Sequence, residues 1–190
     1  MKRLFFVLLL VVCAARADSP GSIYNLHISL TDARGTRHGL DVHRGHPVLI
    51  TMFYGNCPMA CPLLIDTMRS VERSASAADR DRVRFLLISI DPERDTAESL
   101  RKLSVSRKLD ASRWTMARTD AIGVRKIAAL LGIQYRKLPD GSFNHSSVIT
   151  LVTPDGEIAA QSSLMGQADP KLLEALVNIS NGQRKVGDTE

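Results

Sequence analysis

Cysteine is scarce in this sequence, with three residues among 190, at positions 13, 57 and 61. Cys13 lies in an N-terminal segment that we expect to be removed, so Cys57 and Cys61 are the only cysteines of the mature chain. Two cysteines exclude a four-thiolate zinc site or iron–sulfur cluster within one chain. A disulfide between them would close so short a loop that it would add little stability. The pair therefore suggests a chemical function, either disulfide exchange or metal binding. An inactive short disulfide is the alternative.

A long hydrophobic run is also missing. Residues 4–15 carry no charge, but these 12 residues are fewer than the roughly 20 that a membrane-spanning helix needs. Lys2 and Arg3 precede the run and small residues around Ala17 follow it, which is the layout of a secretory signal. We expect residues 1–17 to be a signal peptide cleaved after Ala17 and the rest to be exported, most simply to a bacterial periplasm. Retention of the N-terminus as an anchor is the alternative.

No block of like charge is present, because lysine and arginine alternate with acidic residues along the chain. Loss of residues 1–17 removes three basic side chains and lowers the net charge from +5 to +2. This near-neutral balance argues against a nucleic-acid partner. The sequence has no internal repeat, and its 44% hydrophobic residues can fill one core. We expect one domain over residues 18–180 and a polar, disordered tail over 181–190.

Apolar runs bounded by turn residues predict seven strands. The run at 48–54 is almost continuously apolar, as in a strand that is buried on both faces. Aspartate and glycine near residues 32–35, 139–141 and 154–156 predict turns. The expected strands are 23–30, 48–54, 83–90, 114–117, 134–138, 146–152 and 157–162.

Four helices are expected between and after these strands. One follows the cysteines, one spans 96–108 with Asp95 and Glu98 as a capping box, one spans 120–132, and one begins at Asp169. Their predicted apolar faces are Leu64, Ile65, Met68 and Val71 in the first, Ile122, Ile127, Leu130 and Leu131 in the third, and Leu172, Leu173, Leu176 and Val177 in the last. Alternating strands and helices followed by a hairpin and a closing helix predict an α/β fold, a thioredoxin-like mixed sheet flanked by helices.

Cys57 and Cys61 lie four residues apart where a buried strand passes into a helix. Residues at this spacing share one helix face, and the start of a helix favours thiolate over thiol. Two thiolates suit either disulfide exchange or binding of a soft metal ion. With only two sulfurs available, copper fits better than zinc or an iron–sulfur cluster.

A histidine would complete a copper site, and the chain offers five. His38, His43 and His46 lie in a polar loop, where we expect solvated side chains without a metal role, and His27 is also expected to be a bystander. His145 precedes the predicted strand 146–152. In a thioredoxin-like sheet that edge neighbours the loop bearing the cysteines, so His145 is the candidate third ligand.

Three segments together resemble the Sco/SenC family of copper chaperones. They are Cys57-Pro58-Met59-Ala60-Cys61-Pro62, Asp91-Pro92-Glu93-Arg94-Asp95-Thr96 and Asn144-His145-Ser146-Ser147, and the likeness spans roughly residues 22–180. The resemblance implies a thioredoxin fold that holds Cu(I) or Cu(II) through Cys57, Cys61 and His145. It also implies delivery to the binuclear copper site of cytochrome c oxidase. The implied partners are the oxidase copper subunit or another copper chaperone, together with a thiol reductant, so that the chain works near a membrane through its partner.

By the same similarity Asp91 would lie near the site, where it either balances the charge of the ligands or caps a strand end. Met59 departs from the family pattern, because many relatives carry an acidic residue between the cysteines. This departure bears on partner docking more than on metal binding. Met59 is either a further soft ligand or an exposed loop side chain.

Two enzymatic alternatives remain. In a thiol–disulfide oxidoreductase, Cys57 would attack and Cys61 would resolve the mixed disulfide, so both would be catalytic. Ordinary reductases of this fold have two residues between the cysteines and a proline where this chain has the His145 neighbourhood. A thiol peroxidase is less compatible, because the sequence lacks the expected threonine or serine before Cys57 and an identifiable arginine nearby.

Overall fold

The computed structural model describes residues 19–57 and 60–187, with the backbone alone at 60–61 and 183–187. Its main feature is a seven-stranded mixed sheet with the order β2-β1-β5-β4-β3-β8-β9. Three central strands are parallel, and the strands on both sides of them are antiparallel. The strands are β1 (Leu30–Asp32), β2 (Arg37–His38), β3 (Val48–Phe53), β4 (Arg84–Ser89), β5 (Trp114–Arg118), β8 (Ile149–Val152) and β9 (Ile158–Ser162).

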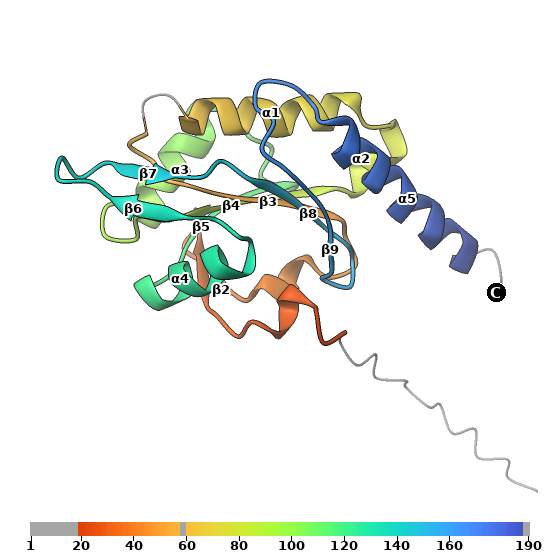
Figure 1. Cartoon of the computed structure of the whole chain (residues 1–190), viewed down its shortest axis with the longest axis horizontal. Coiled ribbons are helices and arrows are strands. Elements are labelled where there is room, and N and C mark those ends of the chain that lie inside the picture. The colour runs from red at the N-terminus through yellow and green to blue at the C-terminus, as the bar shows by residue number, and fades with distance from the viewer. Residues whose placement is uncertain (1–18, 58–59, 188–190) are drawn as a thin grey trace, which may run out of the picture.

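Helices cover both faces of this sheet (Figure 1). On one face lie α1 and α3, the crossovers between parallel strands, and α4 lies on the other. The helices are α1 (Ala60–Ser74), α2 (Ala77–Arg82), α3 (Ala97–Ser106), α4 (Ala121–Leu130) and α5 (Pro170–Gly187). The α/β fold with a thioredoxin-like mixed sheet and flanking helices is confirmed. Within the described residues no helix has the length and apolarity needed to cross a bilayer.

The centre of the core is β3, whose six residues are all buried. It pairs with β4 over its whole length and with β8 over its first three residues. Phe85 of β4 stacks on Trp114 of β5 with ring centroids 4.1 Å apart. Because the apolar run at 48–54 has neighbours on both edges and both faces, its end is a rigid place from which the cysteine loop departs.

The N-terminal strand predicted over residues 23–30 is wrong. Residues Ile23–Asn25 form a 3-10 helix, η1, that is capped by the Ser22 hydroxyl, and the strand β1 starts only at Leu30. The Ile23 N–H donates to the carbonyl of Gly156, which lies in the turn between β8 and β9. This hydrogen bond holds the N-terminal segment against that turn, and Ile23 is buried. A second 3-10 helix, η2 (Leu40–His43), follows β2.

Three helix details also differ from the sequence-based expectation. The capping box of α3 is formed by Thr96 and Ser99, one residue after the expected pair. In α4, Ile122 is 56% exposed and lies off the apolar face, and in α5 Val177 is 46% exposed. Asp120 caps α4 as predicted. Because α5 runs to Gly187, the disorder expected from residue 181 is wrong up to that point.

Residues 134–152 form two separate units instead of two neighbouring strands. Strands β6 (Tyr135–Lys137) and β7 (Phe143–His145) make their own two-stranded ribbon, with the predicted turn at 139–141 between them. Only Ile149–Val152 joins the main sheet, as β8. The expected strand 146–152 therefore begins three residues too early, and β7 was not predicted.

Candidate metal centre

A short turn after the buried strand β3 leads to Cys57. Tyr54 directly follows the strand and is buried, and its carbonyl accepts the Cys57 N–H at 3.2 Å. The Cys57 side chain is half-buried and packs against the core. This thiol is thus held at the end of the sheet, within reach of solvent.

The second cysteine lies in the first turn of α1, as its spacing predicts. The side chain of Cys61 falls outside the described residues, as do Pro58 and Met59. The approach of the two sulfurs, and the roles expected for Met59, therefore stay predictions.

His145 is placed beside the cysteine loop by its contact with Tyr54. It is the last residue of β7 and pairs with Tyr135 of β6. Its ring meets the Tyr54 ring edge to face, with centroids 5.9 Å apart and an interplanar angle of 77°. Because Tyr54 also accepts the Cys57 N–H, the imidazole and the Cys57 loop share one neighbour. The ribbon and the beginning of α1 lie at the same end of the molecule (Figure 1).

The two ring nitrogens of His145 have different surroundings. Nδ1 lies 3.2 Å from the Ser146 carbonyl oxygen, which only accepts hydrogen bonds, so Nδ1 carries the proton. Nε2 is buried and has no hydrogen-bond partner among the residues that the structure describes. Burial lowers the pKa of His145 below its ordinary 6.5, and the Ser146 contact opposes this only in part. The ring is therefore neutral near pH 7, with the Nε2 lone pair ready for a metal ion.

Asp95 stabilises the start of the cysteine loop. Its Oδ2 accepts the Gly55 N–H at 2.9 Å and the Ser89 hydroxyl, and Asp95 is only 5% exposed. A Cβ at Gly55 would lie 2.5 Å from Asp95 Oδ1, so glycine is needed for this close approach. The expected capping role of Asp95 is therefore wrong, because its carboxylate holds the loop instead. The sequence offered one signal for this role, a short acidic residue close after a buried strand.

Asp91 is buried at the end of β4, and its carboxylate pairs with Arg94. The Asp91 N–H donates to the Ser89 hydroxyl at 3.0 Å. These contacts fix the turn after β4. A charge-balancing role toward a metal ion stays a prediction.

The loop histidines differ from one another more than we expected. His43 is 8% exposed, so its expected solvation is wrong, and burial lowers its pKa to about 4. His46 Nδ1 lies 3.1 Å from the Arg82 carbonyl oxygen, and His27 is exposed. The ring centroids of His38 and His43 are 6.3 Å apart. Among the described side chains, no three histidine, cysteine or acidic residues are grouped as a metal site requires.

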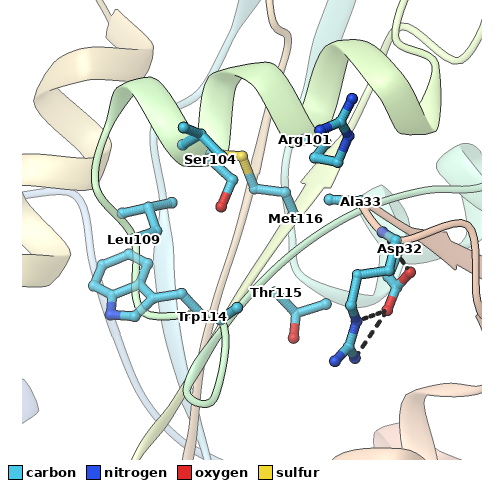
Figure 2. A pocket seen from close by; sticks show the side chains of 11 residues that line it. Asp32, Ala33, Arg101, Ser104, Leu109, Trp114, Thr115 and Met116 are labelled. Carbon is cyan, nitrogen blue, oxygen red and sulfur yellow. Dashed lines mark hydrogen bonds and ion pairs between the residues drawn. The ribbon is translucent and has the colours of Figure 1, made fainter.

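The hollow shown in Figure 2 lies elsewhere, between α3 and the strands β1 and β5. Its volume is about 140 Å³, and Leu109, Trp114 and Met116 supply much of its apolar lining. Arg34, beside it, is paired with the buried Asp32. Neither Cys57 nor His145 lines this hollow, so it is separate from the candidate metal centre.

Two curated relatives are similar to this chain in sequence. The SCO1 protein homolog of Bacillus subtilis is 25% identical over 132 residues, which cover 65% of each protein. The human mitochondrial protein SCO1 homolog is 30% identical over 137 residues, 68% of this chain and 44% of that protein. The match thus spans less than two thirds of the length of each relative.

Among solved structures, ScoI of Bradyrhizobium japonicum with copper bound is similar to this chain. It superimposes with a TM-score of 0.63 and 25% identity, over 81% of this chain and 96% of that one. Residues 17–179 match the sequence profile of the family described as SCO1/SenC, a range that contains Cys57, Cys61 and His145. The chain therefore belongs to the SCO1/SenC family.

Proposed function

We propose that this chain binds one copper ion through Cys57, Cys61 and His145 and passes it to the copper subunit of cytochrome c oxidase or to another copper chaperone. The observation that carries the proposal is the buried Nε2 of His145, which lacks a described partner and lies on the ring that contacts Tyr54 beside the Cys57 loop. Membership of the family and the copper-bound ScoI relative support copper as the metal.

The donor set fits this metal in both oxidation states. Two thiolates are soft ligands that suit Cu(I), whereas imidazole suits Cu(II) as well. The ring is already neutral and oriented through Nδ1, so binding requires the loss of protons only from the thiols. Copper affinity should therefore fall as pH falls through the range in which the thiols become protonated.

Transfer requires that the ligands be accessible to a competing set on the partner. Cys57 is half-buried on a loop at the end of the sheet, and the ribbon with His145 is a separate two-stranded unit. Loops held by a rigid scaffold are the usual places for exchangeable sites. The proposal includes export after cleavage at Ala17, so that delivery takes place in the periplasm at the membrane that holds the oxidase.

A thiol–disulfide oxidoreductase is the second candidate, because Cys57 follows a central strand of a thioredoxin-like sheet and lies three residues before the start of α1. In this reaction the Cys57 thiolate attacks a partner disulfide and releases one partner thiol. Cys61 then attacks the mixed disulfide and releases the second thiol, so the partner gains two electrons and the chain becomes oxidised. An external thiol reductant restores the pair.

Copper binding to four reduced variants separates the two functions. We expect one copper per chain in the wild type, loss of binding in Cys57→Ser and Cys61→Ser, and at least tenfold weaker Cu(II) binding in His145→Ala, since outer-shell changes alone cost roughly 10–100-fold. His27→Ala, at an exposed histidine, is the matched control and should bind as the wild type does. Reduction of a model disulfide should persist in His145→Ala. A reduced wild type that retains no copper near neutral pH would overturn the copper proposal.

A further inference from the structure

The ribbon that carries His145, formed by β6 and β7, is separate from the main sheet. Beneath it lies a hollow of about 230 Å³, between the ribbon, the turn after β4 and α4. Tyr135 and Phe143 line the hollow from the ribbon, and Asp91 and Val124 line it from the body. Tyr135 and Phe143 also pack against the core, so these side chains and a few polar contacts together set the position of the ribbon.

One of these contacts is aromatic and lies near His145. The Phe143 ring packs against the buried Tyr54 with centroids 5.4 Å apart, and the Tyr54 ring also meets His145. Phe143 and His145 are two residues apart in β7, so Tyr54 contacts this strand at two positions. The turn around Gly141 is held by different groups.

Arg94 holds that turn. Its guanidinium pairs with the buried Asp91 carboxylate and also donates to the Gly141 carbonyl. The same group lies 6.0 Å from the centroid of the Phe143 ring. Arg94 thus joins the fixed turn after β4 to both the tip and the aromatic anchor of the ribbon. A planar guanidinium with several donors suits such a double contact, which a lysine ammonium would not reproduce.

A second ion pair, between the ribbon and the body, is expected to contribute less than the Arg94 contacts. Lys137 Nζ lies 2.8 Å from Glu93 Oε2, but both side chains are at least half exposed. Exposed ion pairs of this kind contribute little to stability. The hydrogen bond from Arg94 to Gly141 is also exposed, but its guanidinium is held from the body side by the buried Asp91 carboxylate.

We propose that Arg94 is a positioning residue for His145: by joining Asp91 to the Gly141 carbonyl, it holds the ribbon so that the imidazole stays beside the cysteine loop. The consequence for copper retention rests on the proposed function. The mechanical part does not, because it concerns the ribbon in the metal-free chain.

The test compares Arg94→Gln with Arg136→Gln. Arg136 is an exposed residue of β6, so its substitution removes an arginine charge from the ribbon itself without touching the Asp91–Gly141 connection. In metal-free protein, backbone hydrogen exchange at residues 135–145 should become roughly tenfold faster in Arg94→Gln, the order of magnitude for one charge-assisted hydrogen bond. Exchange in β3, β4 and β5 should stay unchanged, and Arg136→Gln should match the wild type throughout. Arg94→Lys should resemble Arg94→Gln in exchange.

Copper release to a chelator is the second measurement. It should be roughly tenfold faster from Arg94→Gln than from the wild type, with the thiolate-to-copper absorption retained. Unchanged ribbon exchange in Arg94→Gln would overturn the positioning role whatever happens to copper. Faster ribbon exchange in a protein that binds no copper would leave the positioning role standing and would defeat the proposed function instead.

Discussion

At the scale of single residues, the half-buried His145 and the buried His43 show that the same side chain can have different roles. His145 keeps Nδ1 at the Ser146 carbonyl, and its buried Nε2 has no hydrogen-bond partner among the described residues. His43 also has a buried Nε2 without a described partner, but its ring faces His38. Only His145 lies next to a cysteine loop, so a metal role is argued for that residue alone.

Burial of His43 predicts a loss of stability in acid. Its pKa is about 4 in the folded chain against about 6.5 in an unfolded one, because burial disfavours the cation and His38, Arg84 and His46 add positive charge around it. The stabilisation is complete above pH 6.5 and is lost as pH falls from there toward 4.

His43→Gln removes this titration. Between pH 7 and pH 4.5, the wild type should lose about 2 kcal/mol more unfolding free energy than His43→Gln, as measured by urea unfolding at both values. His27→Gln, at an exposed position, serves as the control and should follow the wild type. Equal losses in the wild type and His43→Gln would contradict the account of His43.

At the scale of elements, the junction between β3 and the cysteine loop depends on Gly55. Asp95 accepts the Gly55 N–H from a position 40 residues away in the sequence, so the turn after β4 and the loop after β3 hold each other. This link also explains the shifted start of α3. Because the Asp95 carboxylate is occupied by Gly55 and Ser89, the helix is capped by Thr96 instead.

Gly55→Ala should disrupt the junction. The new Cβ would lie 2.5 Å from Asp95 Oδ1, so Asp95 must move and its buried hydrogen bonds weaken. We expect a loss of about 1–3 kcal/mol in unfolding free energy and weaker copper binding. Chemical denaturation and copper titration measure the two effects. Gly21→Ala is the control, because a Cβ there meets nothing within 4 Å, and a Gly55→Ala protein as stable as this control would count against the account.

At the scale of the whole molecule, the strongest sequence patterns were the most informative. The long apolar runs around β3 and β4 predict central strands because burial on both faces leaves no polar positions, and both strands are confirmed. The three-residue strand β7 was missed because Phe143–His145 is too short to show a period. The region at 23–30 has an alternating pattern, but its contact with Gly156 favours a 3-10 turn.

For the candidate site, the sequence suggested ligands, which stay predictions, but it did not reveal the residues that support them. Cys57, Cys61 and His145 were identified from spacing, position and family resemblance. Asp95 contacts Gly55 and Arg94 contacts Gly141 across 40 and 47 residues of sequence. Such contacts follow from the packing of the whole chain, and a single sequence carries no local pattern that predicts them.

The central claim is that Cys57, Cys61 and His145 share one copper ion. X-ray absorption at the copper edge, on the reduced wild type and on His145→Ala at one copper per chain or the highest attainable loading, tests it most directly. The account predicts two sulfur ligands and a histidine nitrogen in the wild type, and the loss of that nitrogen with retention of both sulfurs in His145→Ala. An unchanged nitrogen signal in His145→Ala, or a wild-type site without two sulfur ligands, would contradict it.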